Sequence, residues 1–222
     1  MSRTDKIFSL LKKKYPHPRI ALKFTDPFES VVSTILSAQC TDVRVNIVTK
    51  DLFKKYRSVK DYAAADIKKF EQEIRSTGFY RNKAKNIVTA AQKVVRDFRG
   101  RVPDTMESLL SLPGVARKTA NVVLYNAFGK NEGIAVDTHV TRVSQRLGLT
   151  RHTDPVKIEQ DLMKLADKKE WGDLSLRLIW HGRQTCQARK PLCPECVVAA
   201  FCPSRKIFYP EGIKPAKENH VG

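Results

Sequence analysis

The sequence lacks any stretch suited to crossing a membrane or directing secretion. Its 222 residues contain no run of eighteen consecutive apolar residues, so we expect no transmembrane helix. The start, MSRTDKIFSLLKKKYP, has neither a clear apolar region nor a cleavage site, and it ends in a lysine run. We interpret it as a short basic amphipathic helix rather than a signal peptide.

Acidic residues are scarce relative to basic ones. The chain has 23 Asp and Glu against 41 Lys and Arg, which gives a net charge of +18 and a pI near 9.9. A soluble protein with this excess usually binds a polyanion, either nucleic acid or an anionic membrane surface. A solvated basic surface without a partner is the alternative, but the imbalance is large for that. The 41% hydrophobic content suffices for one large or two modest domains.

Alternating runs of β-branched residues are also missing, so we predict an all-α protein. Internal repeats and low-complexity linkers are absent as well. We expect the residues from Glu211 onward, which are polar and contain proline, to form a loose tail. Apolar residues recur at helical spacing in segments 28–39, 43–56, 66–76, 82–98, 117–128, 139–147, 156–166 and 174–181.

The five cysteines do not form an even set, which disfavours a disulfide framework and favours a reducing interior. For Cys40, which stands alone, we expect a buried structural role. The other four have the spacing C-x6-C-x2-C-x5-C and are typical of a metal centre. By spacing alone, structural zinc and an iron–sulfur cluster are nearly equal alternatives. These four are Cys186, Cys193, Cys196 and Cys202.

The stretch LPGVARKTANVV, residues 112–123, predicts a hairpin between two helices. With Asp104 as N-cap, the first helix is expected over 105–111, and the second runs from Arg117 to Phe128. A glycine turn followed by a helix start suits a phosphate, because unpaired N–H groups point outward there. An ordinary tight connection between packed helices is the alternative. A nucleotide-binding P-loop is excluded, since no glycine has the required spacing before Lys118.

Three motifs in order resemble the endonuclease III family of DNA glycosylases, within the helix–hairpin–helix superfamily. They are LPGVARKTANVV, AVDTHVTRVSQRLG and CQARKPLCPECVVAAFC. The upstream stretches ILSAQCTDVRVN and STGFYRNKAKNI also match, so the resemblance covers roughly residues 28 to 206. One departure is Ala116, where the family's hairpin usually has a second glycine.

The resemblance implies that Lys118 and Asp137 carry the chemistry. A neutral lysine can form a Schiff base with a sugar carbon, and a position at a helix start disfavours the ammonium form. Lys118 would attack C1′ of the damaged nucleotide, displace the base and permit β-elimination. Asp137 is the family's catalytic aspartate, and an N-cap role is compatible with it. For His139 we expect a local hydrogen-bonding role. A solvated or phosphate-contacting lysine is the alternative for Lys118.

The resemblance also implies contacts with flipped-out DNA. Gln39 would fill the vacated space and Phe79 would wedge against the opposite strand, with Arg81 and Lys83 available for phosphates. The alternatives are a polar cap on helix 28–39 for Gln39 and simple packing after a helix end for Phe79. The other expected DNA contacts are Gly114, Ala116, Arg117, Thr119, Arg189 and Lys190.

For the four clustered cysteines, the resemblance implies a [4Fe–4S] cluster that acts as a structural clip for a basic loop.

The resemblance also implies two helical domains flanking a DNA-binding cleft. A six-helix barrel would span 20–130, with the hairpin at about 105–128. Residues 1–19 and 131–222 would form the cluster domain, with the cluster loop at 186–202.

The function implied is a bifunctional DNA glycosylase and AP lyase for oxidised pyrimidines such as thymine glycol. We expect a cytoplasmic, nucleoid-associated monomer that binds double-stranded DNA with damaged bases or abasic sites and no membrane. An adenine-mismatch glycosylase is disfavoured, because Thr34 stands near the point where that branch has a glutamate. A glycosylase for thymine or uracil opposite guanine, and a non-catalytic DNA-binding protein, are alternatives. An electron carrier fits poorly with the +18 charge.

Overall fold

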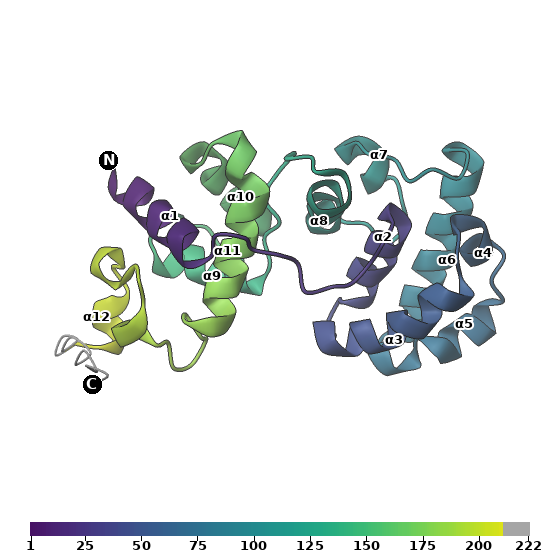
Figure 1. Cartoon of the computed structure of the whole chain (residues 1–222), viewed down its shortest axis with the longest axis horizontal. Helices are drawn as coiled ribbons and strands as arrows, with labels where there is room; N and C mark the ends of the chain where they lie inside the picture. The colour runs from purple at the N-terminus through teal and green to yellow at the C-terminus, as the bar shows by residue number, and fades with distance from the viewer. Residues whose placement is uncertain (211–222) are drawn as a thin grey trace, which may run out of the picture. The chain divides into compact units, whose positions relative to one another are not determined.

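The computed structural model describes residues 1–210, and every regular element in that range is a helix (Figure 1). The predicted all-α class is therefore confirmed. In the same range no helix combines the length and apolar character needed to cross a membrane. The longer helices are α1 (Arg3–Lys14), α2 (Pro27–Leu36), α3 (Asp42–Lys55), α5 (Ile67–Glu73), α6 (Tyr80–Asp97), α8 (Arg117–Phe128), α9 (Thr138–Arg146), α10 (Pro155–Leu165) and α11 (Trp171–Gln184).

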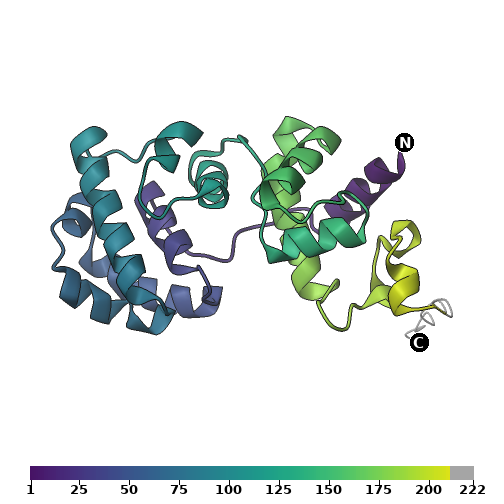
Figure 2. The same cartoon turned by 180° about the vertical axis from the view of Figure 1, so that it is seen from behind.

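The chain divides into two units. One is Ile20–Glu132, and the other combines Met1–Arg19 with the chain from Gly133 onward (Figure 2). Short helices complete both units: α4 (Val59–Ala63), η1 (Arg75–Thr77), α7 (Met106–Leu110), η2 (Lys168–Glu170), η3 (Cys193–Glu195), η4 (Ala199–Phe201) and α12 (Arg205–Phe208).

In the Ile20–Glu132 unit, α2 is the central element. All of its residues except the first are buried, and it packs against α3, α6 and α8 (Figure 1). Asp26 begins the helix by accepting hydrogen bonds from the Phe28 and Glu29 amides, and Pro27 at the first position needs no such partner. The segment that follows α2 and carries Gln39 therefore starts from a helix that is packed in the apolar core.

The other unit is organised around α11, which packs against α1 and α9. Glu170 joins two of these helices, because its carboxylate accepts from Lys12 of α1 and from Arg177 of α11, at 2.8 Å each. Arg177 is buried and also donates to Asp173 at 2.6 Å. Arg177 also donates to the carbonyl of Tyr15, the C-cap residue of α1, at 3.3 Å, so Glu170 and Arg177 both link α1 to α11.

Most helix boundaries agree with the predictions to within two residues. Among the exceptions, α11 extends three residues beyond the predicted 174–181 at each end, and the predicted 66–76 is divided into α5 and η1. The helix predicted over 28–39 ends at Leu36, because the chain turns at Ser37. The N-cap of α7 is Thr105 and not Asp104, whose carboxylate pairs with Lys130 at 2.5 Å instead. The short α4 was not predicted, since one turn is too brief for periodicity to reveal. The predicted tail from Glu211 lies outside the described residues.

Candidate functional site

The hairpin at Leu112–Ala116 requires glycine at one position only. Gly114 has φ +80°, and a Cβ there would lie 2.8 Å from Cβ of Asn86 on α6. Ala116 instead has an extended backbone at φ −88°, which any residue adopts. Alanine in place of the family's second glycine is therefore compatible with this hairpin geometry.

The helix that follows the hairpin begins without a side-chain cap. Ala116 is the N-cap of α8 and has no polar side chain to offer. The first amides of a helix carry partial positive charge and seek an external acceptor when no side chain supplies one. Lys118 is the second residue of this helix and its side chain is exposed. The exposed amine of Lys118 thus belongs to the uncapped first turn of α8.

Asp137 is held at the start of α9. Its Oδ1 accepts a hydrogen bond from the Val140 amide at 2.8 Å, which confirms the N-cap role. The segment before it is buried, and the Ser175 hydroxyl anchors it by donating to the Ala135 carbonyl at 2.7 Å. Asp137 itself is half-buried. Lys118 belongs to the Ile20–Glu132 unit and Asp137 to the other unit.

His139 has the local role expected of it. Its Nδ1 lies 3.2 Å from the Arg142 guanidinium, and burial lowers the pKa of the imidazole. Because the guanidinium can only donate, the ring nitrogen facing it is the acceptor.

Gln39 and Phe79 share an unusual backbone conformation. Their φ angles are +52° and +49°, in the left-handed region that side chains other than glycine rarely adopt. Both residues are exposed, Phe79 to 63%. Packing after a helix end is therefore wrong for Phe79, and a cap on helix 28–39 is wrong for Gln39, because that helix ends three residues earlier. Strained, exposed residues of this kind cluster at functional sites.

Lys83 is not available for phosphates, contrary to the prediction. The residue is only 4% exposed, and its ammonium donates to the carbonyls of Leu36 and Thr77, both at 2.8 Å. Burial lowers its pKa. Arg81 is exposed, as a phosphate contact requires.

The four clustered cysteines line one small cavity together with Leu147, His181 and Phe208. Within residues 1–210, no three Cys, His, Asp or Glu side chains are close enough together to hold a single metal ion. Burial raises the pKa of the thiols of Cys193 and Cys202, and raises that of Cys196 to about 11. Binding of a metal centre by these thiols therefore releases protons.

Two arginines of α9 hold the segment that follows Cys186, and neither was singled out from the sequence. Arg142 donates to the Cys186 carbonyl at 3.1 Å and to the Gly182 carbonyl at 2.8 Å. Arg146 donates to the carbonyls of Gln187 and Ala188, both at 2.7 Å. Their spacing of one helical turn was the available signal, but their carbonyl partners depend on the tertiary fold. The exposed Arg189 and Lys190 follow directly after these anchored carbonyls.

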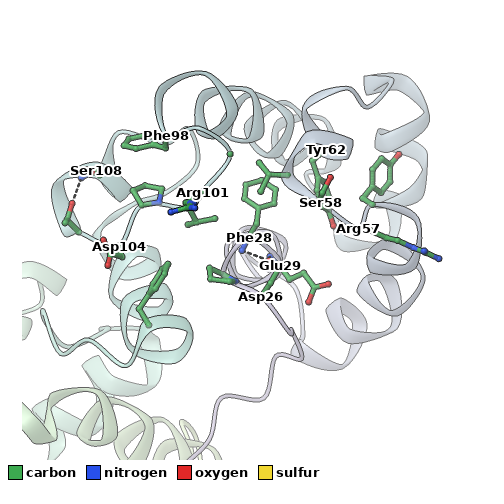
Figure 3. Close-up of a pocket in the computed structure, with 18 residues that line it drawn as sticks. Asp26, Phe28, Glu29, Arg57, Ser58, Tyr62, Phe98, Arg101, Asp104 and Ser108 are labelled. Carbon is green, nitrogen blue, oxygen red and sulfur yellow. Dashed lines mark hydrogen bonds between the residues drawn. The ribbon is translucent and has the colours of Figure 1, made fainter.

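A larger cavity, of about 850 Å³, lies in the Ile20–Glu132 unit (Figure 3). Its lining comes from the start of α2, the start of α4 and the segment between α6 and α7. None of the residues with predicted catalytic or DNA-binding roles lines it. This cavity is therefore separate from the residues for which we predict catalytic and DNA-binding roles.

Residues 32–168 match the family model described as HhH-GPD superfamily base excision DNA repair protein. The helical fold and the glycine hairpin that opens α8 are consistent with this class, and the match covers more than half of the chain. The molecule is thus a base excision DNA repair protein of the helix–hairpin–helix type.

Individual relatives narrow the class. The chain is 55% identical to endonuclease III of Synechocystis sp. over 202 residues, which is 91% of this chain and 92% of the relative. Among solved structures it is similar to a non-covalent endonuclease III–DNA complex and to a trapped endonuclease III–DNA covalent intermediate. Each comparison gives a TM-score of 0.87 and 44% identity, and covers 93% of this chain and 98% of the other. The chain belongs to the endonuclease III family, and it is a bifunctional DNA glycosylase and AP lyase of base excision repair.

Proposed function

We propose that the chain removes oxidised pyrimidines such as thymine glycol from double-stranded DNA, with Lys118 as the nucleophile. The observation that carries this proposal is the exposed amine of Lys118 on the uncapped first turn of α8, directly after the Gly114 hairpin. The family's motif has its catalytic lysine at this position. The solved relative trapped as a covalent intermediate with DNA supports a covalent route.

In the proposed reaction, the neutral amine of Lys118 attacks C1′ of the damaged nucleotide. The C1′–N bond to the base breaks, and the base leaves with one proton from the amine. The C1′–O4′ bond of the sugar then breaks, O4′ takes up a proton, and the C=N bond of the Schiff base forms. Loss of a proton from C2′ then breaks the C3′–O bond and nicks the strand 3′ to the lesion. Lysine is suited to both steps because one covalent link serves base release and elimination.

Asp137 would assist at the first step. Its carboxylate is held in one orientation by the Val140 amide, which leaves its other oxygen for the substrate. A fixed carboxylate stabilises the positive charge that develops on the sugar as the base leaves, or accepts a proton from the lysine.

The DNA contacts are divided among three regions. Gly114, Ala116, Arg117 and Thr119 would bind a phosphate at the hairpin through the helix start. Gln39 and Phe79, both exposed in left-handed conformations, would fill the space of the flipped nucleotide and wedge the opposite strand. Arg81 would bind a phosphate beside them.

The four cysteines fit a [4Fe–4S] cluster better than a zinc ion. In such a cluster each thiolate binds a different iron, so the sulfurs surround a volume and do not converge on one point. The shared cavity has this character, whereas no set of three ligands within residues 1–210 suits a single ion. When bound, the cluster would supply covalent cross-links that hold the loop in place. Arg189 and Lys190 on this loop would contact phosphates.

We infer that the protein acts as a monomer, in the cytoplasm and associated with the nucleoid through DNA. Its ligands would be duplexes with damaged bases or abasic sites. The excess of basic residues supports such binding in any sequence context.

The test is a strand-nicking assay on a duplex with a single thymine glycol, for wild type, Lys118→Gln and Asp137→Asn. Loss of both base release and nicking in Lys118→Gln, with DNA binding retained, is the expected result. Asp137→Asn is expected to lower the rate of base release by about a hundredfold or more. Full activity of Lys118→Gln would overturn the proposal. Activity on thymine opposite guanine but not on thymine glycol would show that the substrate is a mismatch and not an oxidised pyrimidine. The assignment of Lys118 and Asp137 would then still hold.

A further inference from the structure

Lys83 is a buried cation whose position the reaction does not explain. Its side chain lies on α6, and its ammonium donates to two carbonyls that belong to different segments of the chain. A buried ammonium carries a desolvation penalty unless its hydrogen bonds are good. A methionine would fill a similar volume without that penalty, so core packing alone does not account for a lysine here.

Each of the two carbonyls belongs to the last residue of a helix. Leu36 is the last residue of α2, three residues before Gln39, and Thr77 ends η1, two residues before Phe79. Lys83 therefore joins the two segments that lead to Gln39 and Phe79. A cation also interacts favourably with the carbonyl end of a helix such as α2.

Helix packing brings the two segments together, since α2 contacts α6 and α3 contacts η1, and the hydrogen bonds of Lys83 add a polar link between them. No side chain caps the start of α6, where Phe79 is the N-cap residue. Gln39 follows α2 in a turn with local backbone hydrogen bonds, such as that from the Cys40 amide to the Ser37 carbonyl at 3.1 Å. The two hydrogen bonds of Lys83 thus link elements that are 47 and 6 residues away from it in the chain.

We propose that Lys83 is a positioning residue that makes Gln39 and Phe79 act as one unit when a base is extruded from the duplex. This inference rests on the proposed roles of Gln39 and Phe79. Filling the vacated space and wedging the opposite strand must occur at the same base step, so the distance between the two side chains has to be fixed before DNA binds. Lys83 fixes it by binding both segments at one point.

The experiment compares Lys83→Met with wild type on two substrates, a thymine glycol duplex and a duplex with a preformed abasic site. The abasic site has no base to extrude, so its cleavage depends less on Gln39 and Phe79 acting at the same base step. We expect base release from thymine glycol to fall about tenfold and cleavage of the abasic site to change much less. Lys85→Met, an exposed lysine on the same helix, is the matched control and should leave both rates unchanged.

A double-mutant cycle separates positioning from general stability. If Lys83 couples the two segments, Phe79→Ala should slow base release less in the Lys83→Met background than in wild type. Additive effects, or equal losses on both substrates, would overturn the proposal. If Lys83→Met does not fold, Lys83→Gln, which keeps an N–H donor, is measured in the same cycle.

A different result would show that the proposed roles of Gln39 and Phe79 themselves are wrong. If Gln39→Ala and Phe79→Ala both release thymine glycol at the wild-type rate, their proposed DNA contacts are wrong and the coupling has no basis. If these variants are slow and Lys83→Met is as fast as wild type, only the positioning role is wrong.

Discussion

At the scale of single residues, the hairpin shows which of its two small residues is required. Gly114 combines a positive φ with a backbone that lies against Asn86, whereas Ala116 has neither constraint. The family motif has glycine at both places, so a motif alone does not distinguish them. The backbone conformation does.

We therefore predict different outcomes for two matched substitutions. Gly114→Ala should lower the free energy of unfolding by ~1–3 kcal/mol, because the new Cβ meets both the left-handed strain and Asn86. Ala116→Gly should change it by less than about 1 kcal/mol, since glycine is acceptable at an N-cap and no strain is relieved. Urea unfolding measures both. Equal losses would mean that the hairpin geometry described here is wrong.

Lys83 illustrates what sequence could not reveal at this scale. The stretch GFYRNKA suggested a basic, phosphate-binding loop, and Arg81 is exposed as that requires. Lys83 is two residues further along α6 and faces the core, where the carbonyls of Leu36 and Thr77 receive it. Those partners come from tertiary packing, which a helical pattern does not specify.

At the scale of elements, helical periodicity was sufficient for the long helices, because each buries one apolar face. It missed α4, and it extended α2 three residues too far. The overshoot has a physical cause: the residues after Leu36 keep a helical character in sequence, but Gln39 takes a left-handed conformation that no helix continues. Gln39, for which we propose a DNA contact, thus lies where the helical sequence pattern fails.

The contact between α1 and α11 should depend on pH. Hydrogen bonds from Lys12 and then Arg177 lower the pKa of Glu170 below its ordinary value of 4.5. A carboxyl whose folded-state pKa is lowered stabilises the fold above the unfolded pKa and loses that effect as pH falls through the folded pKa. We expect wild type to lose stability on acidification below about pH 4.5 more steeply than Glu170→Gln does.

Thermal unfolding between pH 7 and pH 3 measures this difference. Asp51→Asn, which removes an exposed carboxylate on α3, serves as the control and should follow wild type. Parallel curves for wild type and Glu170→Gln would show that Glu170 does not hold α1 to α11 as described.

At the scale of the whole molecule, the charge of +18 explains affinity for DNA but not the location of the contacts. Most of the basic residues within residues 1–210 are exposed, and only a few need to contact phosphates. The loop after Cys186 is a strong candidate, because Arg146 anchors its carbonyls and leaves Arg189 and Lys190 exposed. A loop that is already ordered loses little entropy on binding.

We predict that replacing Arg189 and Lys190 by alanine reduces the salt dependence of DNA binding. Each phosphate contact contributes about 0.9 to the slope of log affinity against log salt, so the loss of two should lower its magnitude by about 1.8. Binding of undamaged duplex by the Lys118→Gln background at several salt concentrations gives the slope. The same change at Lys68 and Lys69, which are exposed on α5, should leave the slope unaltered. An unchanged slope in the loop variant would remove this loop from the DNA contacts.

The central claim is that one amine, that of Lys118, forms the covalent link to DNA. The most direct measurement is borohydride reduction of the protein on a thymine glycol duplex, followed by mass spectrometry of the cross-linked peptide. Our account predicts the adduct on Lys118 and no adduct from Lys118→Gln. An adduct on another lysine, or on the amino terminus, would contradict it.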